Sequence, residues 1–135
     1  VKPKRDGMPT EKNDRYITDS ICYNASKIAD QTDAMAILSM THSGYTAFQI
    51  ASHRPTTNIV ALTSNKTILN MVSLIWGVQA FYYNKMESTD QTFSDIEKII
   101  KDKGIVSSGD IIVNIASMPI QEKGTTNMLK VSEIK

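Results

Sequence analysis

The chain has 135 residues, and its 15 Lys and Arg against 14 Asp and Glu give a formal net charge of +1 at pH 7. Hydrophobic residues make up 41% and charged residues 21% of the sequence, values that exclude collagen-like, coiled-coil and disordered chains. A near-neutral charge also disfavours a nucleic-acid-binding domain, because such domains carry a concentrated basic excess. We therefore expect one globular domain that folds without disulfides and binds no nucleic acid.

The same sequence predicts a cytoplasmic protein that does not enter a membrane. Its most apolar stretch, residues 71–83, is interrupted by polar residues, whereas a membrane span needs roughly 18 unbroken apolar residues. The lone Cys22 can form no internal disulfide, which fits a reducing compartment, and we expect it to be a packing residue. The chain begins at Val1, as it would after removal of an initiator Met or in a fragment cut from a longer protein.

The predicted elements alternate between helices and strands. Residues 1–13 combine charges with Pro and Gly and predict a tether, so the domain itself is expected at 14–135. Apolar residues at helical spacing predict a first helix that ends near residue 32, and the apolar run 34–40 predicts a strand buried on both faces. A second helix follows and stops before Pro55. Further along we expect strands at 59–62, 78–83, 111–116 and 127–134. Between them we expect a helix that is capped by Ser64 and ends at Gly77. A later helix should begin with a capping box of Ser88 and Gln91 and end at Gly104.

The connections between these strands indicate the fold. Strands separated by helices of about ten or more residues are typical of a mostly parallel sheet with helices on both faces. The last connection, residues 117–126, is too short for such a crossover, so the fifth strand should run antiparallel to the fourth. The predicted fold class is α/β, a three-layer α/β/α sandwich around a mixed five-stranded sheet with strand order 3-2-1-4-5. Phe48 and Trp76 lie in apolar stripes, and we expect both in the core.

Two loops at the carboxyl ends of strands have the composition of a phosphate site. In such sheets, ligands bind where the strand order reverses, here between the first and fourth strands. Free N–H groups at a helix start, hydroxyls and a glycine make the first loop a competent anion cradle, formed by Thr41, His42, Ser43, Gly44, Tyr45 and Thr46. The second loop is a cationic, hydroxyl-rich flap at the same end, formed by Lys123, Gly124, Thr125 and Thr126. The plainer alternatives are that Ser43 is only a helix cap beside a turn glycine, and that the flap is only a surface hairpin loop.

No catalytic set accompanies these loops. The sequence has no Gly-rich dinucleotide fingerprint, phosphate-loop signature or nucleophile elbow. His42 and His53 have no Cys or acidic cluster at metal-ligand spacing, so we expect His42 to be a loop residue and His53 a cation at a helix end. The junction 63–65 should serve only as a helix cap. We expect no catalytic residue, no metal and no cofactor in this chain.

Four stretches of the chain, in the right order and at matching spacing, resemble the C-terminal domain of pyruvate kinase. The first, residues 41–51 (THSGYTAFQIA), is similar to the family's Thr-x-[Ser/Gly]-Gly-x-[Ser/Thr]-Ala effector loop and helix. The others are 59–65 (IVALTSN), 109–113 (GDIIV) and 124–131 (GTTNMLKV). The resemblance covers nearly everything from residue 14 onward and implies the same fold, including a last strand that runs against the others.

The resemblance also implies a division of labour. In that family this domain performs no chemistry, and phosphoryl transfer from phosphoenolpyruvate to ADP, with Mg²⁺ and usually K⁺, takes place in a preceding barrel domain that this chain lacks. The C-terminal domain helps to build the tetramer and, in regulated members, binds a phosphorylated sugar or nucleotide. By position, the loop 41–46 resembles the family's phosphate cradle, and residues 123–126 fall in its flap.

The chain departs from the family at three positions. Members that bind fructose 1,6-bisphosphate commonly have Lys and Arg where this sequence has His42 and Tyr45, and an Arg is frequent where it has Trp76. Each lost cation could supply a charge-assisted hydrogen bond, so a bisphosphate fits less well. A monophosphorylated sugar, a nucleotide, or no effector at all remain open.

Two hypotheses for function follow. The leading one is that the chain is the regulatory and oligomerisation domain of a pyruvate kinase, separated from its barrel. The alternative is a free-standing module of the same fold that binds a phosphometabolite and acts in trans. A phospho-accepting receiver domain is disfavoured because Thr41, Thr63 and Tyr83 stand near the strand ends where it needs acidic residues. The fifth strand is expected at a sheet edge, which favours a homo-oligomer.

Overall fold

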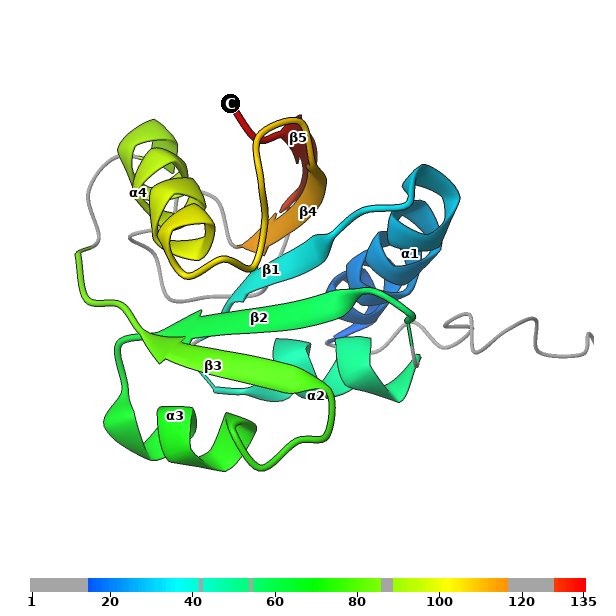
Figure 1. The fold of residues 1–135 in the computed structure, drawn as a ribbon. Helices are drawn as coiled ribbons and strands as arrows, with labels where there is room; N and C mark the ends of the chain where they lie inside the picture. The colour runs from blue at the N-terminus through cyan, green and yellow to red at the C-terminus, as the bar shows by residue number, and fades with distance from the viewer. Residues whose placement is uncertain (1–14, 42, 54, 86–88, 117–127) are drawn as a thin grey trace, which may run out of the picture.

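The computed structural model describes residues 15–41, 43–53, 55–85, 89–116 and 128–135 (Figure 1). The predicted tether at 1–13, Ser88 of the predicted capping box and the flap 123–126 lie outside these residues. Every predicted helix and strand is present as the type expected: α1 (Tyr16–Thr32), β1 (Ala36–Met40), α2 (Tyr45–Ser52), β2 (Asn58–Thr63), α3 (Lys66–Val72), β3 (Val78–Tyr82), α4 (Thr89–Asp102), β4 (Ile111–Ala116) and β5 (Met128–Glu133).

One five-stranded sheet in the order β3-β2-β1-β4-β5 forms the centre of the fold. β1 runs parallel to both β2 and β4, and β2 runs parallel to β3. β5 is antiparallel to β4, with Ala116 opposite Met128. The predicted strand order and the reversed last strand are therefore confirmed.

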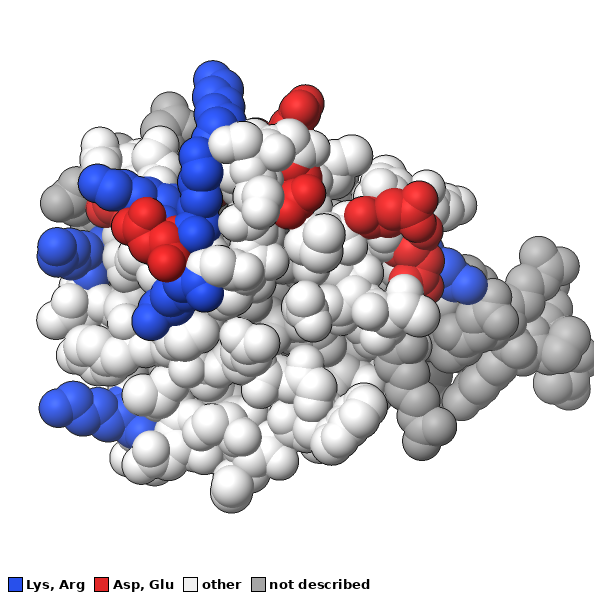
Figure 2. Space-filling view, viewed as in Figure 1, with Lys and Arg blue, Asp and Glu red and all other residues white. Residues whose placement is uncertain are grey.

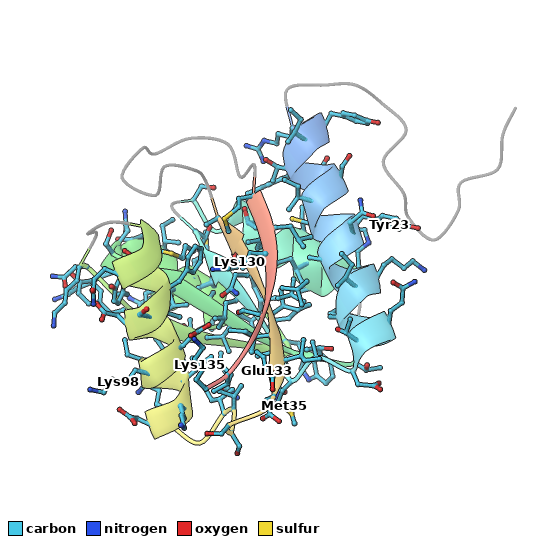
Figure 3. All side chains as sticks on the ribbon, turned by 90° about the horizontal axis from the view of Figure 1, so that it is seen from above. Tyr23, Met35, Lys98, Lys130, Glu133 and Lys135 are labelled. Atoms are coloured by element: carbon cyan, nitrogen blue, oxygen red, sulfur yellow. The ribbon has the colours of Figure 1, made fainter. Side chains whose placement is uncertain are left out.

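The described helices lie on both faces of the sheet, so the three-layer prediction is also confirmed. α4 covers one face with Phe93, Ile96 and Ile100, whereas α1, α2 and α3 cover the other. Figure 3, which looks onto the β5 edge, shows α4 on one side of the sheet and α1 on the other. Neighbouring residues of a strand point to opposite faces, so Leu38 packs on the α4 side and Ile37 on the α1 side. This explains why β1 is buried along its whole length.

The starts and ends of the helices follow from local chemistry. α3 begins one residue later than predicted, because Asn65 rather than Ser64 is its N-cap. The Asn65 Oδ1 atom accepts hydrogen bonds from the backbone N–H groups of Thr67 (2.9 Å) and Ile68 (3.1 Å). α4 ends at Asp102, just before Gly104, whose φ of +76° is the left-handed conformation that terminates helices.

Two aromatic residues predicted for the core lie on the surface instead. Trp76 is 95% exposed and Phe48 is 59% exposed. The prediction for Trp76 was wrong because α3 ends at Val72 and not at Gly77 as predicted, so Trp76 lies in the following turn and not on the helix stripe. In α2, the buried residues are Thr46, Ala47 and Ile50, and Phe48 lies on the outer side of the helix.

A candidate phosphate-binding loop

The loop that follows β1 lies at the point where the strand order reverses. The backbone N–H of Thr41 donates to the carbonyl of Leu62 (3.0 Å), which extends the pairing of β1 with β2. On the other side, Ser39 pairs with Ile115, so the carboxyl ends of β1 and β4 are level. The connection 117–127 joins the paired residues Ala116 and Met128 at the same end. The two loops therefore leave the sheet at the same end, and the juxtaposition of the flap with the first loop stays a prediction because the flap lies outside the described residues.

The hydroxyls of the loop already make hydrogen bonds within it. The Thr41 Oγ1 atom accepts from the backbone N–H of Gly44 (2.8 Å), and the Ser43 Oγ atom accepts from the backbone N–H of Tyr45 (3.3 Å). The backbone N–H groups of Gly44 and Tyr45, which were predicted to be free for an anion, therefore donate to side chains of the same loop. Each hydroxyl keeps one hydrogen with which it can donate to a ligand. Of the two, Ser43 is exposed and Thr41 is buried.

Gly44 fixes the position of this loop on α3. It is the N-cap of α2, with a φ of +85°, so the plainer prediction of Ser43 as the cap is wrong. A Cβ atom at this position would lie 2.9 Å from Met71 Cε and 3.1 Å from Val72 Cγ1. A glycine is therefore required both for the backbone conformation and for the close approach of the loop to α3.

Arg15, the N-cap of α1, brings a cation to Tyr45 that the sequence did not predict. The guanidinium of Arg15 lies over the ring of Tyr45, 3.8 Å from the ring centroid to Cζ. The Tyr45 hydroxyl donates to Asp19 Oδ1 (2.6 Å), and Gln49 Nε2 donates to the same oxygen (3.1 Å). Partial burial and the hydrogen bond to Asp19 raise the pKa of Tyr45, and Arg15 opposes this shift. Arg15 and Asp19 are one helical turn apart in sequence. Only the packing of α1 against α2 shows that both side chains contact Tyr45.

The remaining candidate residues have structural roles in the part of the chain that is described. The junction 63–65 is a helix cap, as predicted, and its Thr63 Oγ1 atom accepts from the N–H of Asn65 (3.2 Å). Cys22 is fully buried, which confirms it as a packing residue, and burial raises the pKa of its thiol to about 12. His53 is the C-cap of α2, as expected of a helix-end residue, but partial burial lowers its pKa and so disfavours the predicted cation. His42 lies outside the described residues.

The described residues contain no group of three or more His, Cys, Asp or Glu side chains placed to hold a metal ion. Among them there is also no helix long and apolar enough to span a membrane.

Comparison with known proteins places the chain in a family. A family model described as "Pyruvate kinase, alpha/beta domain" matches residues 19–132. The chain belongs to the pyruvate kinase family and corresponds to its C-terminal α/β domain. The resemblance inferred from the four stretches of sequence is therefore confirmed.

Individual pyruvate kinases match the domain in sequence and in structure. The chain is 33% identical to the pyruvate kinase of Lactobacillus delbrueckii subsp. bulgaricus over 118 residues, 87% of the chain and 20% of that protein. It is 33% identical to that of Geobacillus stearothermophilus over 125 residues, 93% of the chain and 21% of that protein. A crystal structure of a Cryptosporidium parvum pyruvate kinase superimposes with a TM-score of 0.81 over 94% of the chain and 24% of that chain, at 21% identity, which shows a shared fold. The chain thus spans about a fifth of the length of the curated relatives.

Proposed function

We propose that this chain is the regulatory and assembly domain of a pyruvate kinase. Phosphoryl transfer from phosphoenolpyruvate to ADP, with its Mg²⁺ and K⁺, then takes place in another part of the enzyme. Membership of the family supports this role, together with the fact that the chain spans only about a fifth of its curated relatives. The domain contributes regulation by binding a phosphorylated ligand at the loop 41–46.

The placement of Arg15 is the observation that carries the ligand site. Its guanidinium lies over the ring of Tyr45, the first residue of α2, so that a permanent cation contacts the side chain at the start of this helix. Both the helix dipole and the cation attract an anion at this position. A guanidinium also presents paired donors that match the oxygens of a phosphate.

The charges around the loop favour one phosphate over two. Arg15 brings one cation to the loop, whereas the family pattern for a bisphosphate has two within it. The carboxylate of Asp19 is held 2.6 Å from the Tyr45 hydroxyl, close to the loop, and would repel a second phosphate. We expect a monophosphorylated sugar or a nucleotide monophosphate to bind more tightly than fructose 1,6-bisphosphate.

Isothermal titration calorimetry of the chain with glucose 6-phosphate, AMP and fructose 1,6-bisphosphate tests this proposal. Arg15→Gln should weaken the binding of the preferred ligand about tenfold or more, since a hydrogen bond to a charged group is worth about 1.5–3 kcal/mol. The matched control is Lys103→Gln, an equal change of charge at an exposed residue just beyond the end of α4. Absence of binding by all three ligands, or equal weakening by both substitutions, would contradict the effector site.

The assembly role rests on the β5 edge of the sheet. In the described part of the chain, β5 is the terminal strand of the sheet (Figure 3). Val131 on this strand is 44% exposed. An unpaired edge strand is a template for pairing with a second chain, so we propose that the domain contributes to a homo-oligomer through β5. Sedimentation velocity of the chain and of Val131→Glu measures this directly, and a wild-type chain that is monomeric at high concentration would contradict it.

A further inference from the structure

Two rows of side chains meet where α1 packs against α2. Both rows have a spacing of four residues, which places side chains on one face of a helix. On α1 and its N-cap the row is Arg15, Asp19, Tyr23 and Lys27, and on α2 and its C-cap it is Tyr45, Gln49 and His53. We call these seven side chains the polar seam. It begins at the proposed phosphate loop, which contains Tyr45, and ends at His53.

Contacts across the polar seam connect its two ends. Next to the loop, Tyr45 stacks with Arg15 and donates to Asp19 Oδ1 (2.6 Å). One turn further along α2, Gln49 Nε2 donates to the same oxygen (3.1 Å). At the far end, the ring of His53 meets the ring of Tyr23 edge to face, with 5.6 Å between the centroids and 75° between the planes. Side chains of α1 thus contact α2 from its first residue to its C-cap.

The ring of His53 is held in a position that suits only its neutral form. Its Nε2 atom is buried and has no hydrogen-bond partner among the described residues. A neutral imidazole leaves one nitrogen as a bare lone pair, whereas the protonated ring carries a hydrogen on both. A buried charged donor without an acceptor is strongly disfavoured. Burial accordingly lowers the pKa of His53, and the charge of Asp19 opposes this shift while that of Lys27 adds to it.

A recess beside the ring offers the protonated form a second position. The recess has a volume of about 270 Å³. Apart from His53 itself, its lining consists of polar side chains of α1: Tyr23, Ser26, Lys27 and Asp30. In the described part of the chain, the charged and titratable groups around His53 are therefore Asp19, Tyr23, Lys27 and Asp30. Figure 2 shows acidic side chains gathered over α1. Two carboxylates against one ammonium, at the C-terminus of α2, favour an imidazolium in this recess.

We propose that His53 is a proton-sensitive switch that acts on the phosphate loop through the polar seam. A proton from solvent adds to the ring nitrogen that has no hydrogen, and the ring turns from its buried position into the recess. Asp30 and Asp19 receive its charge there. Asp19 then binds Tyr45 less strongly, and the ring of Tyr45 loosens together with the Arg15 guanidinium stacked on it. The movement of Tyr45 needs no ligand, whereas its effect on ligand affinity rests on the proposed phosphate site.

Nuclear magnetic resonance of the ligand-free 135-residue chain between about pH 5 and pH 8 tests the switch. We expect His53 to titrate with a pKa below its ordinary 6.5, and the nuclear Overhauser contact between the His53 and Tyr23 rings to be lost with the same midpoint. The ring signals of Tyr45 should shift with that midpoint as well. A contact with Tyr23 that persists in the protonated form, or Tyr45 signals that do not follow His53, would overturn the proposal.

Substitutions in the polar seam test the path of the signal. His53→Gln should abolish the shift of Tyr45, and it assigns the His53 signal, since His42 is the other histidine. Asp19→Asn keeps an acceptor for Tyr45 but removes the charge, so His53 should still titrate while Tyr45 no longer follows it. The matched control is Asp102→Asn, an equal change of charge at an exposed residue of α4, which should leave the shift as in the wild type. A shift that survives Asp19→Asn unchanged would show that the polar seam does not carry the signal.

Calorimetry separates the switch from the ligand site. Between about pH 7.5 and pH 5.5, the binding of glucose 6-phosphate and AMP should weaken about fivefold more in the wild type than in His53→Gln, because a loosened Arg15 must be ordered again. Ionisation of the ligand phosphate is common to both proteins and cancels. The eight residues of α2 span about 12 Å, so direct attraction between the imidazolium and the ligand is largely screened. Equal weakening in the two proteins would refute the effect on affinity. If neither ligand binds, the phosphate site fails, and the resonance experiment alone decides the switch.

Discussion

Replacing Gly44 by Ala should destabilise the domain in two separable ways. The first is the backbone, because a φ of +85° costs a residue with a Cβ atom about 1–2 kcal/mol. The second is the contact with α3, where the new Cβ atom would lie 3.1 Å from Val72 Cγ1 and 2.9 Å from Met71 Cε. Met71 can move, since the contact involves the end of a flexible and half-exposed side chain, but Val72 is fully buried. The contact therefore adds about 1–2 kcal/mol, near the low end of the cost of overpacking.

The sum, about 2–4 kcal/mol, is a large part of the stability of an ordinary domain. At the usual unfolding entropy per residue, it lowers the melting temperature by roughly 7–14 °C. Urea denaturation of the wild type, Gly44→Ala and Gly109→Ala measures it. Gly109 is the matched control because its φ is +91° but a Cβ atom there would meet nothing within 4 Å, so it reports the backbone cost alone. Equal losses in the two variants would refute the packing of the loop against α3.

Three further predictions follow from buried polar and titratable groups. Asn114→Ala should lower the free energy of unfolding by about 1–3 kcal/mol in urea denaturation and speed amide exchange in β5. The reason is that Asn114 Nδ2 donates to Lys130 O (3.3 Å) and Ser132 Oγ (3.0 Å) on that strand. An unchanged urea midpoint would count against this role of Asn114. The Cys22 thiol of the native protein should not react with Ellman's reagent at pH 8. The free energy of unfolding should fall as pH rises from the thiol's ordinary pKa of 9.0 toward about 12, since the unfolded thiol ionises first. A Cys22→Ala variant whose free energy of unfolding falls equally over this pH range would contradict this. His53 has a lowered pKa, so the native state resists its protonation, and stability should fall as pH drops through 6.5; His53→Gln should flatten this fall in thermal melts, and an equal fall in the variant would rule His53 out.

The sequence was sufficient for the order and type of the elements because their signals are local. The run 36–40 is apolar without interruption, as expected of a strand with a helix layer on each side, and the structure buries all of it. The short connection 117–126 could not hold a crossover helix, and β5 accordingly runs antiparallel to β4. These two observations fix the sheet, and with it the place where the loop after β1 must lie.

The exposed aromatics and the cation at the loop could not be predicted in the same way. Trp76 continues the apolar stripe of α3 in sequence, but the helix ends at Val72, and no local pattern specifies that end. Arg15 lies about thirty residues from Tyr45 in the chain, and only the packing of α1 on α2 brings its guanidinium within 3.8 Å of that ring. The scarcity of charge between Asp33 and Lys85, where only Arg54 and Lys66 occur, was visible in the sequence, and it was the signal that an apolar stripe there did not have to be core.

α3 packs directly against the proposed phosphate loop. Its residues Met71 and Val72 lie where a Cβ atom on Gly44 would collide with them, and of the two only Val72 is fully buried. A ligand that displaces the loop toward α3 must therefore shift Val72 and the helix that carries it, because a packed interior leaves little free space. We expect backbone amide exchange in α3 to change when the ligand binds. Exchange rates in α3 that are the same with and without ligand would show that the helix does not respond to the loop.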